Sequence, residues 1–185
     1  GHIESPDGDM MLMAMPMFHV GGSSYALFGP ATGTAGYVIP EVDAGLLAQA
    51  MMAGVTHAFL VPAVVAALIQ AGPEAMGLFS RLKAFSYGAA PMPLPILRAA
   101  LEAWPTTKFM QVYGRPEFGA AAAGDRDDAA HRDTAHMERL VSAGKPIAGV
   151  EVRVVDPATL EDVEAGTSGE LWFRTEQATP GYHGQ

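Results

Sequence analysis

The hydrophobic positions of this chain fall into short runs separated by segments with helical spacing. Residues 10–17 are apolar on both alternating sides, with Met11 and Met13 on one side and Leu12 and Ala14 on the other. A strand that is covered on both faces, as in a parallel sheet, has this pattern. Comparable apolar runs predict further strands over residues 36–39, 57–61, 84–87 and 108–113.

Helical signals lie between these runs, over residues 23–28, 43–53, 62–71 and 93–104. Asp43 is placed to cap the second of these helices, and Gly54 is placed to end it. Pro62 suits the first turn of the third helix, and the fourth carries leucines at helical spacing. The alternation of strands and helices predicts an α/β fold, with helices covering a parallel sheet in an α/β/α arrangement.

The pattern changes after Gly124. Residues 125–138 are charged and rich in turn-forming residues, so we expect an exposed loop there. Residues 151–154 alternate polar and apolar positions, residues 164–169 are turn-like, and residues 170–174 form another apolar run. This order of signals predicts an antiparallel hairpin near the end of the chain.

Composition narrows the functional classes. The formal net charge is −9 and the cations are scattered, which argues against a nucleic-acid surface, because such a surface needs clustered cations. The chain has no cysteine, which excludes disulfides and thiolate metal sites and fits a cytoplasmic protein. The longest apolar run, residues 58–69, contains Pro62 and is too short for a transmembrane segment. A chain of 185 residues predicts one domain, or one domain and a piece of another.

Two short segments carry candidate chemistry. The first, Gly88-Ala89-Ala90-Pro91, follows an expected strand, where open α/β sheets bind ligands, although the tetrapeptide alone is also an ordinary turn. The second reads Gln111-Val112-Tyr113-Gly114-Arg115-Pro116-Glu117. On their own, Tyr113 is also explained as an aromatic residue at a strand end and Glu117 as a solvated carboxylate. A single carboxylate binds Mg²⁺ poorly unless substrate phosphates supply the other ligands, so the second segment makes chemical sense with a nucleotide.

In their order along the chain, these segments resemble those of the AMP-forming adenylating enzymes, the superfamily of acyl-CoA synthetases, luciferases and peptide-synthetase adenylation domains. Residues 111–117 resemble the Gln-x-Tyr-Gly-x-Thr-Glu motif, and residues 86–92 resemble the Gly-Gly-Ala-Pro-Leu loop. Residues 15–22 resemble the Pro-Leu-Phe-His segment. Residues 144–156 are similar to the Gly-x-Pro and valine-rich segment, and residues 169–182 to the late Gly-Glu-Leu…Gly-Tyr signature. Each match is weak alone, but the ordered set is specific.

The resemblance implies a nucleotide site. Tyr113 would flank adenine, and the backbone of the Gly88-Ala89-Ala90-Pro91 loop would cradle the same base. Gln111, Gly114 and the residue at position 116 would complete the cofactor-binding set. Small side chains in the loop let the backbone approach a flat base closely, and Gly114 permits an unusual backbone turn.

The resemblance also implies the candidate catalytic residues, Glu117 and His19. Glu117 would help to hold Mg²⁺, and His19 would border the acyl pocket beside the substrate carboxylate. A structural role is an equally good explanation of a lone histidine after an apolar strand. The implied cofactors are ATP, Mg²⁺ and CoA.

Pro116 departs from the motif, because it stands where the family has a threonine whose hydroxyl contacts the α-phosphate. Proline has neither a hydroxyl nor a backbone N–H, and it pushes the preceding Arg115 towards extended geometry. Loss of one charge-assisted hydrogen bond, worth about 1.5–3 kcal/mol, would weaken nucleotide binding by roughly 10- to 100-fold.

The resemblance implies an ATP-dependent acyl-CoA synthetase, which joins a small carboxylic acid to ATP, releases pyrophosphate and passes the acyl group to CoA. One alternative is a degenerate relative that binds nucleotide or acyl ligand without catalysis, which Pro116 favours. Another is the adenylation domain of a peptide synthetase. That class usually has Phe-Asp where this chain has Phe18-His19, so a substrate without an α-amino group is favoured.

The same family carries a Ser-, Thr- and Gly-rich phosphate loop, a Thr-Gly-Asp segment and a mobile domain with a catalytic lysine. None of these occurs in the 185 residues, so we expect an internal fragment of the large N-terminal domain of a synthetase, inactive by itself. The resemblance implies that a distorted antiparallel β-barrel begins late in the chain. The expected division is an α/β subdomain over residues 1–142 and a partial β-barrel subdomain over residues 143–185.

Overall fold

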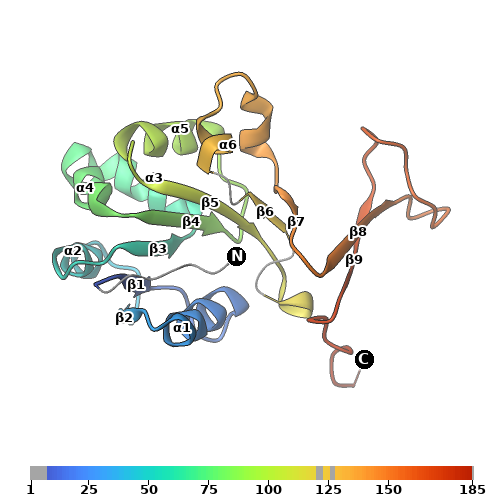
Figure 1. Ribbon diagram of the computed structural model, residues 1–185, viewed down its shortest axis with the longest axis horizontal. Helices are drawn as coiled ribbons and strands as arrows, with labels where there is room; N and C mark the ends of the chain where they lie inside the picture. Colours follow the sequence, from blue (N-terminus) through green and yellow to red (C-terminus); the bar gives the residue numbers. More distant parts are fainter. Residues whose placement is uncertain (1–7, 120–122, 126–127, 185) are drawn as a thin grey trace.

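The structure is a computed structural model that describes residues 8–119, 123–125 and 128–184. A large sheet with helices packed beside it is followed by a separate small sheet (Figure 1). The elements up to the middle of the chain are β1 (Met10–Met13), α1 (Val20–Thr32), β2 (Ala35–Val38), α2 (Ala44–Met52), β3 (His57–Leu60), α3 (Pro62–Ala71), α4 (Pro73–Leu78), η1 (Phe79–Arg81) and β4 (Ala84–Gly88). The later elements are α5 (Leu94–Ala103), β5 (Lys108–Tyr113), η2 (Pro116–Phe118), β6 (Ala123–Asp125), α6 (Asp128–Arg132), η3 (Met137–Val141), β7 (Lys145–Pro146), β8 (Val150–Val155) and β9 (Glu170–Thr175).

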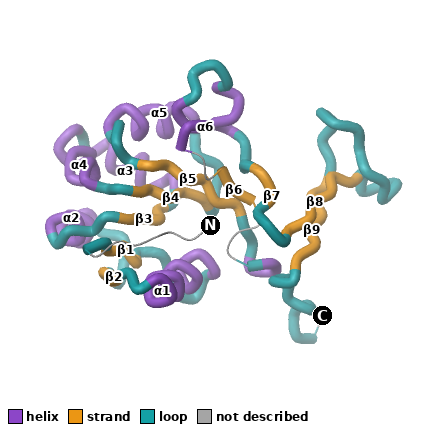
Figure 2. Tube along the Cα trace, viewed as in Figure 1, coloured by secondary structure: helices purple, strands orange, loops and turns teal. Residues whose placement is uncertain are grey.

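The large sheet confirms the predicted parallel α/β fold. Within the described residues it has seven strands in the order β2-β1-β3-β4-β5-β6-β7. The first five strands pair in parallel, and β6 and β7 extend the sheet in antiparallel fashion. Helices α3, α4 and α5 contact one another, whereas α1 lies away from this group beside β1 and β2 (Figures 1 and 2). Because the first five strands run in the same direction, their carboxyl ends lie along one edge of the sheet.

Aromatic side chains fill the centre of the core. Trp104, Phe85 and Phe109 are fully buried, and the Phe85 ring centroid lies 5.3 Å from that of Trp104 and 5.5 Å from that of Phe109. The indole N–H of Trp104 donates to the carbonyl of Met76 at 2.8 Å, so the one polar atom of this ring is satisfied. Replacing such a ring by alanine typically costs about 3–5 kcal/mol.

The helix signals were accurate where a cap was visible. The Asp43 side chain accepts hydrogen bonds from the backbone N–H groups of Gly45 and Leu46, at 2.8 and 3.1 Å, and so caps α2 as predicted. Helix α3 begins at Pro62 and ends at Ala71, as expected. Without such a signal the expectations were less complete. Strand β1 ends at Met13, α1 extends well beyond the expected residues 23–28, and α4 was not expected.

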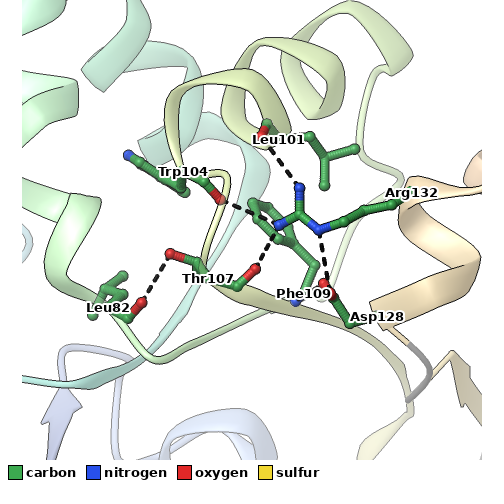
Figure 3. A network of polar contacts seen from close by, with 7 residues as sticks. All are labelled: Leu82, Leu101, Trp104, Thr107, Phe109, Asp128 and Arg132. Atoms are coloured by element: carbon green, nitrogen blue, oxygen red, sulfur yellow. Dashed lines mark hydrogen bonds and ion pairs between the residues drawn. The ribbon is translucent and has the colours of Figure 1, made fainter.

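The exposed loop expected over residues 125–138 is wrong for much of that segment. It contains α6, and η3 begins within it; residues 126–127 lie outside the described residues. The Asp128 carboxylate accepts from the backbone N–H of Phe109 at 2.9 Å. The Arg132 guanidinium donates to the carbonyls of Trp104 and Thr107, at 3.2 and 2.7 Å (Figure 3). Asp128 and Arg132 thus bind backbone groups around the turn between α5 and β5. A pattern of polar residues does not distinguish charges with backbone partners from charges that are solvated.

The predicted hairpin is present as strands β8 and β9, which pair in antiparallel fashion from Val150 opposite Thr175 to Val155 opposite Glu170. In Figure 1 it projects away from the large sheet, beyond β7. Leu171 and Trp172 are consecutive in β9 and so point to opposite faces of this small sheet, and both side chains are exposed. The division at residue 142 and the β-barrel stay predictions.

No helix among the described residues combines the length and the apolar character that a membrane crossing requires.

Asp9 forms an ion pair with the half-exposed Lys83 near the amino end of the sheet. Its carboxylate is buried and contacts Nζ of Lys83, while the Oγ1 of Thr56 contacts Nδ1 of the neighbouring His57 at 2.8 Å. Burial alone would raise the pKa of Asp9. The hydrogen bond from Lys83, together with the positive charges of His57 and Lys83, nevertheless holds that pKa below its ordinary value. The folded chain therefore releases this proton at a lower pH than the unfolded chain does.

We expect Asp9→Asn to lower the free energy of unfolding by about 1–2 kcal/mol at pH 7, because it removes a charged hydrogen bond. The contribution of the pair is complete above the unfolded pKa of about 3.9 and is lost as the pH falls through the depressed folded value. Urea unfolding of both proteins at pH 7 and pH 3 should show the difference shrinking at pH 3. Asp162→Asn, at an exposed pair with Arg153, is the control with little effect at either pH. An Asp9→Asn difference that is equal at both pH values would contradict the ion pair.

Candidate functional site

The sequence motifs gather at the carboxyl edge of the parallel strands. Residues 15–22 follow β1, residues 89–92 follow β4, and residues 114–117 follow β5. Because β1, β3, β4 and β5 all run in the same direction, these segments leave the sheet at one edge. In open α/β sheets this edge is where ligands bind.

Gly88 ends β4 at a point where two backbones nearly touch. It pairs with Val112 of β5, and a Cβ built on Gly88 would lie 2.2 Å from the carbonyl oxygen of Val112. The next residue, Ala89, has φ 64°, a left-handed conformation that is uncommon for a residue with a side chain. The predicted loop therefore begins with a close approach of two backbones at Gly88 and a left-handed backbone conformation at Ala89.

A cavity of about 450 Å³ joins the two predicted nucleotide segments. Ala89, Ala90 and Pro91 line one side of it, and residues 111–114 line the other. Three of those later positions, Gln111, Tyr113 and Gly114, are among the residues expected to bind the cofactor; Gly88 and Pro116 are not lining residues. The remaining wall comes from residues 92–94, Tyr87, Leu140, Val141 and Ala143. The lining is mostly apolar, with a few polar groups, as in many small-molecule sites.

Tyr87 lines the cavity and also contacts α6, which lies in the charged segment that we expected to be a loop. Its hydroxyl lies 2.9 Å from Nε2 of His131 in α6, and both side chains are buried. The two rings meet edge to face, with centroids 5.8 Å apart. Helix α6 also contacts η3, which supplies Leu140 and Val141 to the lining of the same cavity.

Tyr113 receives support from the distant hairpin. Its ring centroid lies 5.9 Å from that of Phe173 in β9, and the Phe173 ring also stacks on Phe118 of η2 at 4.6 Å. Together with the buried Val150 these rings form a second, small hydrophobic cluster. The turn after β5 is therefore packed against β9.

Glu117 lies in η2, on the turn after Tyr113. Its Oε1 accepts a hydrogen bond from the hydroxyl of Tyr182 at 3.0 Å, and Nε of Arg115 lies 3.6 Å from Oε2. Oε2 has almost no accessible surface and no hydrogen-bond partner in another residue. The backbone amide of Glu117 itself, then the Tyr182 hydroxyl, hold the pKa of Glu117 below its ordinary value despite some desolvation. The same hydrogen bond to the carboxylate raises the pKa of Tyr182.

Pro116 has the effect on local geometry that the sequence predicts. It begins η2, and Arg115 before it is extended, with φ −141° and ψ 153°. The side chain of Arg115 is exposed and folds towards Glu117. Position 116 therefore offers neither a hydroxyl nor an N–H at this edge of the sheet.

Glu117 is a suitable ligand for Mg²⁺ when the phosphates of a nucleotide and water supply the other ligands. Among the described residues no group of three or more histidines, aspartates and glutamates is arranged to hold a metal ion. Glu117 is a single, partly exposed carboxylate, and it stands at the edge where a nucleotide would lie. Mg²⁺ commonly takes one or two carboxylates and completes its shell with phosphates and water, so this residue suits a nucleotide-bound Mg²⁺.

The structure does not bring His19 to the cavity. His19 is exposed and precedes α1, and its ring lies 5.5 Å from that of Phe18, which is 89% exposed. The segment follows β1, and β3 separates β1 from β4, after which the loop of the cavity begins. His19 shares the carboxyl edge with the cavity without lining it, and its acyl-pocket role stays a prediction.

Sequence reasoning missed the residues that support this site from far along the chain. Tyr182 belongs to the late Gly-Tyr signature, but its contact with Glu117 spans 65 positions. The Tyr87–His131 contact spans 44 positions. Local periodicity carries no information on such contacts, and the one available signal was the ordered position of the Gly-Tyr pair itself.

Comparisons with known proteins agree with this arrangement. The sequence pattern of the family described as AMP-binding enzyme matches residues 2–183. 4-coumarate–CoA ligase-like 4 of Oryza sativa subsp. japonica is 30% identical over 184 residues, which cover 94% of this chain and 30% of that protein. 2-succinylbenzoate–CoA ligase of Bacillus cereus (strain Q1) is 29% identical, over 95% of this chain and 34% of the relative.

The fold comparison gives the same architecture. The o-succinylbenzoate CoA synthetase MenE of Bacillus subtilis, solved with its acyl-adenylate intermediate OSB-AMP, has a TM-score of 0.79 at 22% identity, covering 98% of this chain and 35% of that one. A peptide-synthetase protein with adenylation and carrier domains also has a TM-score of 0.79, at 19% identity, over 95% of this chain and 30% of that one. The fold therefore does not separate ligases from peptide-synthetase domains. The chain spans about a third of the length of these proteins.

Proposed function

Because this chain belongs to the AMP-binding enzyme family, we propose that the full-length protein is an ATP-dependent acyl-CoA synthetase. It would join a small carboxylic acid to ATP, giving an acyl-adenylate and pyrophosphate, and then transfer the acyl group to CoA as a thioester. The matched relatives named as CoA ligases support this choice. The chain matches about 30% of the first of them, so we expect the 185-residue chain alone to be inactive.

The observation that carries the proposal is the cavity between residues 89–91 and residues 111–114. Adenine would lie between the ring of Tyr113 and the backbone of the loop, where small side chains leave the backbone accessible. The apolar wall would exclude water from the base, and the phosphates would extend towards Glu117. Preorganised groups at such an edge stabilise charge as pyrophosphate leaves.

Glu117 would hold Mg²⁺, which supplies charge stabilisation at the phosphates when it is bound. His19 would border the acyl site beside the substrate carboxylate, from the exposed segment after β1. The absence of an aspartate at this position favours an acid without an α-amino group over a peptide-synthetase substrate. A cytoplasmic location, in keeping with a chain without cysteine, belongs to the same proposal.

Pro116 supports the rival proposal of a degenerate binding protein, and release of pyrophosphate separates the two. The full-length protein is incubated with ATP, Mg²⁺ and a panel of fatty and aromatic acids, and then with CoA. Acid-dependent pyrophosphate release followed by thioester formation is the expected result. Nucleotide binding without pyrophosphate release for any acid would favour the degenerate relative.

The variant Pro116→Thr should tighten binding of a non-hydrolysable acyl-AMP analogue to the full-length protein. Threonine restores a hydroxyl and an N–H near the α-phosphate, and charge-assisted hydrogen bonds to phosphate are strong. We expect a gain of about 3- to 10-fold, below the full value of one such bond because other groups share the phosphates. Calorimetry measures the gain, with Glu117→Ala as a companion change that should reduce it. Unchanged affinity in Pro116→Thr would mean that position 116 does not contact the nucleotide.

A further inference from the structure

Residues 177–182 fold back onto the turn that carries Glu117. The backbone N–H of Thr179 donates to the carbonyl of Glu117 at 2.8 Å, and the Tyr182 hydroxyl donates to its Oε1 at 3.0 Å. A Cβ on Gly119 would lie 2.6 Å from Oε1 of Gln177, which shows how closely this segment approaches the turn. Both the backbone and the side chain of Glu117 are thus held by residues more than sixty positions away.

The two oxygens of the Glu117 carboxylate are not equivalent. Oε2 has almost no accessible surface, whereas the side chain as a whole is 35% exposed. A cation arriving from solvent would therefore meet the carboxylate at Oε1 unless the side chain rotated. Oε1 is the atom that Tyr182 holds, and a carboxylate oxygen has room for a hydrogen bond and a cation together.

We propose that Tyr182 is a positioning residue that orients Oε1 of Glu117 for coordination of nucleotide-bound Mg²⁺. This inference rests on the proposed function, because the cation is the one that accompanies ATP. The phenol restricts rotation of the carboxylate, and the Thr179–Glu117 backbone contact restricts the turn beneath it. Hydrogen-bonded partners of metal-ligating carboxylates commonly have this orienting role, and their loss typically weakens metal affinity by about 10- to 100-fold.

Arg115 does not supply the same restraint. Its Nε lies 3.6 Å from Oε2, beyond hydrogen-bond distance, whereas the Tyr182 hydroxyl lies 3.0 Å from Oε1. Both side chains are largely exposed, so the difference between them is the hydrogen bond, which an ion pair at 3.6 Å does not form. The Tyr182 hydroxyl is the group whose removal should release the carboxylate.

The test uses the full-length protein and calorimetric titration with ATP, once with Mg²⁺ and once with EDTA. In Tyr182→Phe the gain in ATP affinity that Mg²⁺ confers should fall about 10-fold, while affinity in EDTA stays unchanged. Phenylalanine keeps the ring, so the packing of the segment is preserved. Tyr37→Phe, which removes a phenol from β2 at the far edge of the sheet, is the matched control and should change neither titration.

A double-mutant comparison isolates the role in positioning Glu117. In a Glu117→Gln background, Tyr182→Phe should cause no further loss of the Mg²⁺-dependent gain, because the oriented carboxylate is already gone. If Mg²⁺ increases the ATP affinity of Tyr182→Phe as much as that of the unmodified protein, the inference is overturned and the proposed function stays in place. An equal loss with Mg²⁺ and with EDTA would also overturn it, because that pattern belongs to packing of the segment. Equal ATP affinity with and without Mg²⁺ in the unmodified protein would overturn both proposals.

Discussion

Replacing Gly88 with alanine should destabilise the 185-residue chain by about 3 kcal/mol or more, at the upper end of the range for overpacking. The added Cβ would lie 2.2 Å from the carbonyl oxygen of Val112, which is a backbone atom in the neighbouring strand. No rotation of a side chain relieves that contact, so β4 and β5 must separate at the edge where the cavity lies. Binding at the cavity should fall together with stability.

Gly77→Ala is the matched control for this change. Gly77 lies in α4, has no atom within 4 Å of an added Cβ, and does not have a positive φ. Alanine there should be neutral or should stabilise the chain by up to about 1 kcal/mol, because alanine favours helix more than glycine does. Urea unfolding of both variants measures the difference. A Gly88→Ala variant as stable as Gly77→Ala would contradict the close approach of β4 and β5.

Removing the Arg132 guanidinium should destabilise the chain by about 2–4 kcal/mol, because several carbonyls lose a charged donor at once. Its N–H groups bind Trp104 and Thr107, a weaker contact at 3.5 Å reaches Leu101, and Nε pairs with Asp128 at 3.2 Å (Figure 3). The guanidinium also lies 5.8 Å from the centroid of the Phe109 ring. Arg132 therefore satisfies the end of α5 and fixes α6 beside it.

The test compares Arg132→Ala and Arg132→Lys by urea unfolding. Lysine should recover part of the loss, since it keeps the charge without the planar fork of donors. Arg174→Ala is the control, because Arg174 is 80% exposed and pairs with Glu151 at the surface, where about 1 kcal/mol or less is expected. If Arg132→Ala and Arg174→Ala lose the same stability, the network in Figure 3 is not a stabilising one.

The sequence predicted the parts of the fold that local patterns determine. Apolar runs located β3, β4 and β5, and the capping signals at Asp43 and Pro62 located α2 and α3. Each of these signals depends on residues within a few positions of one another. The parallel sheet followed from their alternation, because consecutive parallel strands need a crossover between them.

The missed features depend on contacts between distant residues. The charges of α6 looked like those of a solvated loop because their partners, such as the carbonyl of Thr107, are backbone groups that no pattern marks. His19 and the cavity follow different strands, and the strand order that places β3 between β1 and β4 is not visible in the sequence. Tyr182 was part of a recognised signature, but its partner Glu117 became evident only when the chain was folded.

The two segments expected to bind nucleotide are neighbours in the structure because each follows its own strand. Residues 88–91 and 111–114 end β4 and β5, which are adjacent in the sheet, so pairing alone brings them together. The binding roles of these residues stay predictions. The apolar wall from Leu140 and Val141 was missed, since it comes from η3, a short helix that no pattern in the sequence predicted.

The most direct measurement is a crystal structure of the full-length protein with a non-hydrolysable acyl-AMP analogue. We predict that adenine lies in the cavity between the ring of Tyr113 and the backbone of residues 89–91, with the phosphate directed towards Glu117. Adenine bound elsewhere, with this cavity filled by protein side chains or solvent, would contradict the nucleotide site on which the proposed function depends.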